Sequence, residues 1–287
     1  MRLRLMALLV VPAAACVDDP NLSQPPVVDS GGYHHFAQTG WIIPATYGEG
    51  NSTGFDFDDN GEIDNQAGAV MGGLQAFGLD VLTANREAFA SGDLVVLHSV
   101  RADSLVDDAS ASWRILSGLA VAPPRFDGTD LLIVAGESGL LSGSIDDGVL
   151  DASFGGVTLR VPFFRDQAPL LVPLVGARVE MTPTAEGCHG LIGGALDEAT
   201  LDADVLPALA AQIVTHMDRN PEHELTAVVH DIFDADADGV ATATEIASAE
   251  LTRSLFRLDL DRDRDGDRDS VSFALGFACV PARFVAE

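Results

Sequence analysis

The chain contains no lysine. All 16 of its basic residues are arginine, against 44 acidic residues, and the formal net charge is -28. A surface this acidic repels phosphate backbones and anionic lipid head groups, which excludes nucleic acid as a partner. Without lysine, the chain also cannot form a glycine-rich phosphate-binding loop of the glycine-lysine type. Bound divalent cations would relieve part of the repulsion among so many carboxylates.

Signatures of catalysis are also missing. Gly136-Glu-Ser-Gly139 lacks the second spacer of a G-x-S-x-G nucleophile elbow. His216, His223 and His230 recur every seven residues, but Pro221 breaks that register, so we expect exposed helix histidines and not a metal-binding stripe. Aromatic residues make up only 6% of the chain, which disfavours an aromatic platform for sugars. We therefore predict a protein that is not an enzyme.

Long hydrophobic runs are absent after the first 16 residues, so no later segment is predicted to span a membrane. Residues 1–16 have a basic start, a short apolar run and small residues before Cys16, as a secretory signal does. Residues 13–16 resemble a bacterial lipobox, which implies cleavage before Cys16 and a lipid on that cysteine. The alternative is an ordinary signal peptide cut near Ala15. Residues 17–32 are rich in Pro, Asp and Ser and are predicted to form a flexible tether.

Cysteine is scarce, with three residues in the chain. If Cys16 carries lipid, Cys188 and Cys279 remain, and an even number in an exported protein favours a disulfide bond. Closing a loop of this length contributes roughly 4 kcal/mol on the chain-entropy account. Two separate buried thiols are the alternative.

Acidic residues are abundant, and their clearest pattern is at 234–245, which has the spacing of an EF-hand calcium loop with Gly239 at position 6 for the sharp turn. Apolar residues at helical spacing precede the loop, and a capping box of Thr242 and Glu245 follows it. The predicted calcium ligands supply side-chain or backbone oxygens: Asp234, Asp236, Asp238, Val240, Thr242 and Glu245. The alternative is a solvated acidic turn.

A second acidic cluster occupies residues 56–64, with Gly61 at position 6. Its twelfth position is Ala67, so no bidentate glutamate closes it, and the preceding residues do not predict a helix. It resembles the shorter Asp-rich calcium turns of thrombospondin type 3 repeats. The predicted ligands are Asp56, Asp58, Asn60, Glu62 and Asp64. A solvated turn is again the alternative.

The third cluster runs over residues 261–269 and places Gly266 at position 6, with Ser272 as a weak closing residue at position 12. Arginines fill several of the intervening positions, so a surface run of self-paired Asp and Arg is the alternative. The predicted ligands are Asp261, Asp263, Asp265, Asp267 and Asp269.

Hydrophobic periodicity predicts both helices and strands. A period of two predicts strands near 94–100, 113–116, 131–135, 156–163, 177–181 and 190–196, and apolar residues at helical spacing predict helices near 66–77, 80–92 and 198–218. No long helix separates the strands, which favours antiparallel pairing. We predict an α+β fold with an antiparallel β-sheet or sandwich core flanked by helices. Residues 33–218 would form this β-rich domain, and residues 219–287 an EF-hand region ending in a strand.

Four stretches together resemble a group of uncharacterised bacterial lipoproteins that contain EF-hands: residues 55–65, 176–180, 193–209 and 274–281. The resemblance implies a calcium-binding (Ca2+) protein of the cell envelope and no catalytic residues.

Our leading interpretation is a non-enzymatic calcium-binding lipoprotein. Its calcium is structural, and the lipid on Cys16 attaches it to a membrane, the outer membrane or cell surface in preference to the inner membrane. The alternatives are a calcium-dependent adhesin and an exported hydrolase or polysaccharide-binding module. A deep pocket with convergent carboxylates and an aromatic floor would favour the last of these. The sequence identifies no protein or polysaccharide partner.

Overall fold

The computed structural model describes residues 31–75 and 79–286. The predicted signal peptide, Cys16 and residues 17–30 of the predicted tether lie outside the described residues, and Gly32 already belongs to the first strand. Within the described ranges, no helix is both long and apolar enough to cross a membrane.

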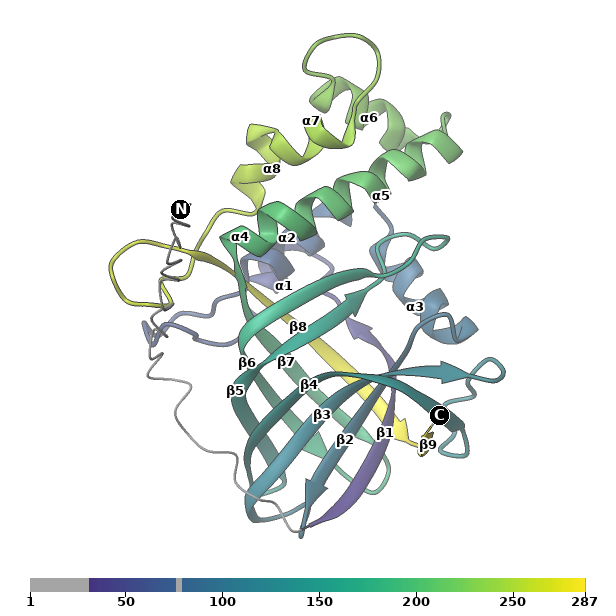
Figure 1. Ribbon diagram of the computed structural model, residues 1–287, viewed down its shortest axis with the longest axis vertical. Coiled ribbons are helices and arrows are strands. Elements are labelled where there is room, and N and C mark those ends of the chain that lie inside the picture. Colours follow the sequence, from purple (N-terminus) through teal and green to yellow (C-terminus); the bar gives the residue numbers. More distant parts are fainter. Residues whose placement is uncertain (1–30, 76–78, 287) are drawn as a thin grey trace, which may run out of the picture.

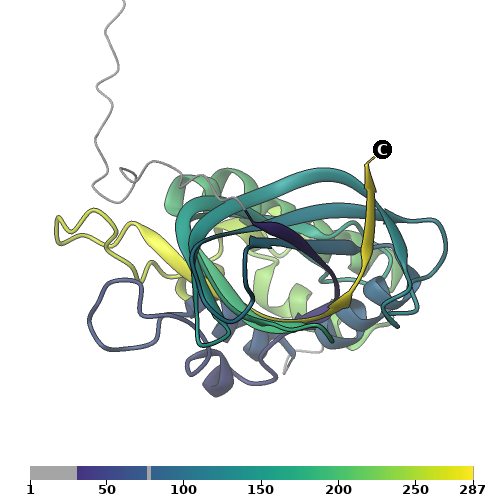
Figure 2. The same ribbon diagram turned by 90° about the horizontal axis from the view of Figure 1, so that it is seen from below.

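Eight strands of the described chain form a closed antiparallel β-barrel, which is seen as a ring in Figure 2. They are β1 (Gly32–Ile42), β2 (Val95–Ala102), β3 (Asp108–Ala120), β4 (Leu131–Asp146), β5 (Val149–Val161), β6 (Leu170–Pro183), β7 (Cys188–Asp197) and β8 (Ser270–Pro281). Each strand pairs with the next in sequence, and β8 returns to pair with β1. A short strand, β9 (Arg283–Ala286), pairs in parallel with β4.

The predicted open sheet or sandwich flanked by helices is therefore wrong. The six segments with a period of two fall in β2 to β7, and the predicted C-terminal strand corresponds to β8, but β1 was not predicted. Every barrel strand has a neighbour on both sides. Closure depends on pairing between β1 and β8, where the Thr39 hydroxyl donates to the carbonyl of Ala278, 239 residues away, over 3.0 Å. A local hydrophobic period reports which face of a strand is buried, and it carries no information on whether the first and last strands meet.

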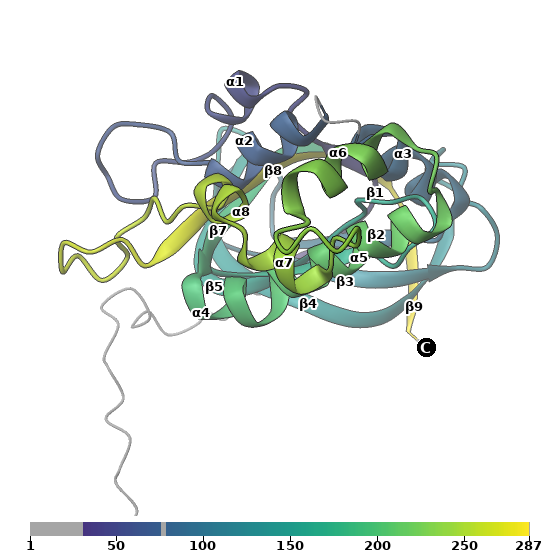
Figure 3. The same ribbon diagram turned by 90° about the horizontal axis from the view of Figure 1, so that it is seen from above.

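The helices gather towards one end of the barrel and do not flank its wall (Figures 1 and 3). They are α1 (Tyr47–Gly50), α2 (Gln66–Leu74), α3 (Val81–Ser91), α4 (Glu198–Thr200), α5 (Leu206–Arg219), α6 (Glu224–Phe233), α7 (Ala243–Ser248) and α8 (Glu250–Leu255). Their apolar faces and the barrel interior belong to one continuous hydrophobic core. The helical end therefore closes over the barrel and is packed against it.

Pro207 lies near the start of α5 and has no backbone N–H to give to a preceding turn. Just upstream, Leu201–Val205 forms a wider π-helical turn, in which the N–H of Leu206 donates to the carbonyl of Leu201. The helix predicted at 198–218 is thus present, with the proline accommodated by this wider turn and not by a break.

The barrel interior is apolar except for a small polar group on β1 and β2. Nε2 of His98 lies 2.9 Å from Oε1 of Gln38, and the His98 ring stacks on Phe277 with ring centroids 4.6 Å apart. Both polar side chains are buried, and burial lowers the pKa of His98 to about 3. His98 is therefore neutral at pH 7 in the folded protein, and because Gln38 Oε1 can only accept, its proton resides on Nε2.

Cys188 and Cys279 form the predicted disulfide bond. They lie directly opposite each other on β7 and β8, with a Cα–Cα distance of 4.9 Å, and both are buried. The bond therefore joins the two strands that precede and follow the helical region 198–255.

Replacing both cysteines with alanine should lower the free energy of unfolding by about 2–5 kcal/mol, because the unfolded chain regains the entropy of an open 91-residue segment. Urea denaturation of the oxidised protein and of the double variant measures the difference. Reducing agent should destabilise the parent to a similar extent and leave the double variant unchanged. Equal stability of the two oxidised proteins would contradict the prediction.

Acid should weaken the fold through His98. Its pKa is about 6.5 in the unfolded chain and about 3 in the barrel, so between these values the unfolded state binds the extra proton and stability falls as pH falls. Between pH 6.5 and pH 5 this loss amounts to about 2 kcal/mol. The double variant His98→Phe, Gln38→Leu removes both hydrogen-bonding partners and should not show this loss. Parallel pH dependence of the two unfolding free energies would exclude His98 as the cause.

Candidate functional site

The three Asp-rich segments share one backbone conformation. We call residues 56–64 loop A, residues 234–245 loop B and residues 261–269 loop C. Their position-6 residues, Gly61, Gly239 and Gly266, have φ angles of +87°, +87° and +103°. The position-4 residues also have positive φ, +60° at Asp59, +58° at Ala237 and +60° at Arg264. Left-handed backbone at position 6 favours glycine, which is the reason for its place in the motif.

Three hydrogen bonds recur at the same positions of each loop. The N–H at position 6 donates to the carboxylate at position 1 over 2.8, 2.8 and 2.9 Å in loops A, B and C. The N–H at position 5 donates to the side chain at position 3 over 3.2, 3.2 and 3.1 Å. The N–H at position 7 donates to the side chain at position 5 over 2.7, 2.8 and 2.9 Å. These bonds turn the acidic side chains towards the inside of each loop.

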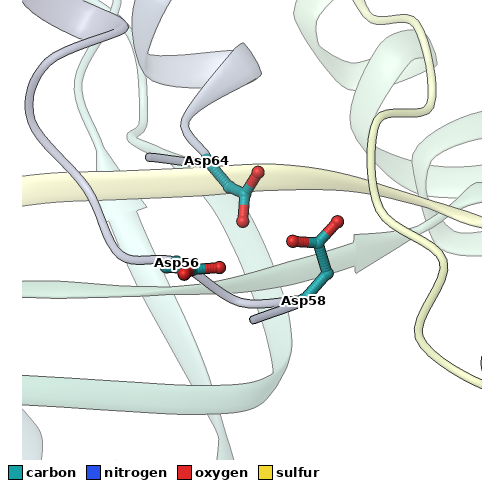
Figure 4. Close-up of side chains that lie close together, drawn as sticks. All are labelled: Asp56, Asp58 and Asp64. Carbon is teal, nitrogen blue, oxygen red and sulfur yellow. The ribbon is translucent and has the colours of Figure 1, made fainter. Parts of the chain in front are cut away.

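Loop A brings Asp56, Asp58 and Asp64 together, with one oxygen of each within 4.8 Å of the others (Figure 4). Asp64 is buried, and burial raises its pKa to about 6, with a further increase from the charges of Asp58 and other nearby aspartates. Its Oδ2 accepts a 2.7 Å hydrogen bond from the N–H of Phe57, and this bond lowers the pKa of Asp64 and so offsets part of the increase. Three carboxylates so close together can hold a metal ion.

The other two predicted donors of loop A are not part of this carboxylate group. Oδ1 of Asn60 accepts from the N–H of Glu62, and the side chain of Glu62 is exposed.

Loop B brings Asp234, Asp236 and Glu245 within 4.8 Å of one another. Oε2 of Glu245 accepts from the N–H and the hydroxyl of Thr242, both at 2.8 Å, and Oε1 accepts from the N–H of Ala235 at 3.0 Å. The bonds from Thr242, backbone first, hold the pKa of Glu245 below its usual range. Glu245 thus remains ionised and fixed across the mouth of the loop.

The remaining predicted ligands of loop B have other contacts. Asp238 lies outside the carboxylate group, and its Oδ1 accepts from the N–H of Val240. Thr242 is the N-cap of α7, and it forms the predicted capping box with Glu245. Helix α6 ends at Phe233, directly before the loop, so a helix precedes and follows the ligands as expected.

His230 is a contact of loop B that the sequence analysis missed. Its Nδ1 accepts from the N–H of Ala241 at 3.3 Å, and the side chain of Ala241 is buried in the core. Ala241 is position 8, which in paired loops bonds to a second loop. In this chain the N–H at position 8 bonds instead to the side chain of His230 in α6. His230 lies one helical turn before Asp234, and that spacing could have identified the contact from the sequence.

Loop C brings together Asp261, Asp263 and Asp265, the first three predicted donors. Asp267 and Asp269 lie outside this group, and Oδ1 of Asp269 accepts from the hydroxyl of Ser270 at 2.7 Å. All five predicted ligands carry exposed or half-buried side chains, and no helix begins directly after the loop to cap it.

Loops A and C are both anchored to β8. The buried Asn65, just after loop A, accepts from the N–H of Ala274 at 2.8 Å and donates to its carbonyl at 3.0 Å. Asp259, just before loop C, accepts from the N–H of Ser272 at 2.8 Å and also from its hydroxyl. Burial raises the pKa of Asp259, and these bonds act against that increase. The sequence analysis predicted neither anchor. Ala274 lies far from Asn65 in the sequence, and the pairing of Asp259 with Ser272 depends on the position of β8, which the sequence does not reveal.

Comparison with known proteins finds no match to the chain among protein families, curated proteins or solved structures.

Asn65→Ala should lower the free energy of unfolding by about 3 kcal/mol, because it leaves buried backbone groups of β8 and α2 without partners. Thermal and denaturant unfolding measure the effect. Asn51→Ala, at the exposed end of α1, is the matched control and should stay within about 0.5 kcal/mol of the parent. A similar small effect at Asn65 would show that the anchor contributes little.

Proposed function

We propose that this chain is a calcium-binding, non-enzymatic lipoprotein of the bacterial cell envelope. The observation that carries the proposal is the threefold repetition of one loop geometry, in which the same positions supply backbone N–H donors and positions 1 and 3 direct carboxylates inward, towards a third carboxylate of the loop. A solvated acidic turn has no need to reproduce that geometry in three unrelated parts of a chain.

The ligand chemistry favours a hard cation. Each group consists of carboxylates alone, without the thiolate or imidazole ligands that zinc and copper prefer. Calcium takes six to eight oxygens at flexible angles, which suits loops that also offer amide, hydroxyl and carbonyl oxygens. We therefore propose calcium at all three loops, with the predicted residues as its ligands.

Repulsion inside each loop supports the same conclusion. Two like charges about 4 Å apart repel by about 1 kcal/mol in water and about 4 kcal/mol at the effective dielectric of a protein surface. The recurring N–H donors offset part of that repulsion, and a divalent cation would offset the rest. If each site binds calcium with a dissociation constant of about 10⁻⁴ M, millimolar calcium stabilises the fold by roughly 1.4 kcal/mol per site.

The calcium would be structural, because loop B joins α6 to α7, and loops A and C are anchored to β8 through Asn65 and Asp259. Cys16 would carry the lipid that attaches the chain to a membrane, and the outer membrane or the cell surface is the favoured location. This part of the proposal is supported by the lipobox resemblance and the secretory composition of residues 1–16.

Calorimetric titration of calcium into the purified chain tests the proposal. We expect three sites in the parent and two in Glu245→Gln, whose melting temperature in calcium should fall towards the value in chelator. Glutamine still completes a capping box, so the melting temperature in chelator should not change. Glu250→Gln, in the exposed first turn of α8, is the matched control and should retain three sites. Identical melting temperatures of the parent with and without chelator would refute a structural role for calcium.

A further inference from the structure

Two histidines are in contact where α5 gives way to α6, at the helical end of the barrel (Figure 1). His216 lies in the last turn of α5, and His223 is the N-cap of α6. Their ring centroids are 5.1 Å apart with an edge-to-face orientation, and the His216 ring also stacks on Phe164, which follows β5, at 4.7 Å. His223 is exposed as the sequence predicts, but His216 is half-buried.

Asn220 determines the protonation state of His216. Its side-chain nitrogen donates to the backbone carbonyl of His216 at 2.9 Å and lies 3.4 Å from Nδ1 of the same residue. Turning the amide over would place its oxygen against that carbonyl, so the nitrogen must face Nδ1. Nδ1 of His216 is therefore the acceptor of this contact and carries no proton.

His223 is also required in its neutral form. Its Nδ1 accepts from the N–H of Leu225 at 3.2 Å, which is the capping bond of α6. This N–H belongs to the first turn, where no preceding turn supplies an acceptor. An imidazolium carries a proton on both ring nitrogens and accepts no hydrogen bond. Protonation of His223 therefore removes the cap.

The start of α6 depends on the same few bonds. The backbone carbonyl of Asn220 accepts from the N–H of His223 at 3.0 Å and from the hydroxyl of Thr226 at 2.8 Å. Leu225 and Thr226, in the first turn of α6, are buried. A change in the turn at Asn220 would therefore displace residues that pack in the core.

Helix α5 is held to the barrel independently of this turn. The side chain of Gln212 donates to the carbonyl of Ala168 at 3.0 Å, and the side chain of Gln167 donates to the carbonyl of Gln212 at 2.9 Å. Both contacts tie the middle of α5 to the segment between β5 and β6. If the turn loosens, the first turn of α6 should move and α5 should stay.

Charged groups surround the histidine pair on several elements: Asp80 of α3, Arg165 and Asp166 between β5 and β6, Arg219 of α5, and Glu222 and Glu224 beside His223 in the chain. Most are already engaged, since Asp166 pairs with Arg219, Arg165 lies 2.6 Å from Glu87, and Asp80 caps α3. Burial lowers the pKa of His216, the charge of His223 lowers it further, and Asp166 acts against both.

We propose that His216, Asn220 and His223 form a pH-sensitive switch, which holds the first turn of α6 against α5 while both histidines are neutral and releases it when they are protonated. The switch uses no bound ligand. It gives the helical end of the molecule a response to mild acid that is separate from unfolding of the barrel.

The direction of the effect follows from linkage. The pKa of His216 is lowered in the folded state, whereas a histidine in a released segment has a pKa of about 6.5. The released state therefore binds the proton more readily, and the switch opens as pH falls below about 6.5. Between pH 7.5 and pH 5.5, opening should increase by about tenfold if one histidine takes up a proton and by about a hundredfold if both do.

Amide hydrogen exchange of the full chain, measured by NMR in chelator at both pH values and corrected for intrinsic rates, tests the proposal. Protection of residues 225–228 should fall by about tenfold to a hundredfold at pH 5.5, while protection in β6 and β7 falls less. His223→Asn supplies a capping oxygen that does not titrate and should reduce this loss. The double variant His216→Gln, His223→Asn should remove most of it.

His189→Gln, at an exposed histidine of β7, is the matched control and should behave as the parent does. Equal protection of residues 225–228 in the parent at the two pH values would overturn the proposal without any variant. A parent-like loss in the double variant would place the responsible group elsewhere. An equal loss in β6 and β7 would mean that acid acts on the whole fold and not on this turn. Because chelator is present throughout, none of these outcomes depends on the proposed calcium binding.

Discussion

The pairing of β8 with β1 and β7 is the constraint on which the rest of the structure depends. This strand closes the barrel, carries Cys279 opposite Cys188, and presents the backbone groups of Ala274 that hold Asn65. Two residues earlier, Ser272 holds Asp259. One strand thus determines both the closure of the β-structure and the positions of two acidic loops that are about 200 residues apart in sequence. A shift in its register would displace the disulfide and both anchors together.

Electrostatics explains why the acidic loops share a geometry and differ in closure. In each loop the backbone directs N–H groups at carboxylates, which stabilises negative charge without any lysine in the chain. Loop B is closed by Glu245 from a following helix, whereas the third carboxylate of loop A is the buried Asp64 at position 9. Loop C has only its first three aspartates. The same turn is therefore combined with a third carboxylate from a different position in each loop, position 9 in loop A, position 12 in loop B and position 5 in loop C.

The parts of this structure that could be predicted from the sequence are the local ones. The alternation of Val157, Leu159 and Val161 identifies β5, and the spacing from Asp234 to Glu245 identifies the carboxylates of loop B, because both patterns depend on neighbours within a few residues. Closure of the barrel and the anchor at Asn65 could not be predicted. Each depends on segments that meet only after strand registers are set, and no periodicity encodes those meetings.

The place of β8 at residues 270–281 also determines the order in which this molecule can assemble. As the chain is synthesised, β1 emerges first and waits, with one edge unpaired, until the last barrel strand arrives. Until then β7 exposes an edge as well, and unpaired edges invite association with other chains. Contacts so distant in sequence form slowly. A newly made molecule therefore passes through a long vulnerable period, during which cellular holding factors that shield strand edges would determine how much of it reaches the native state.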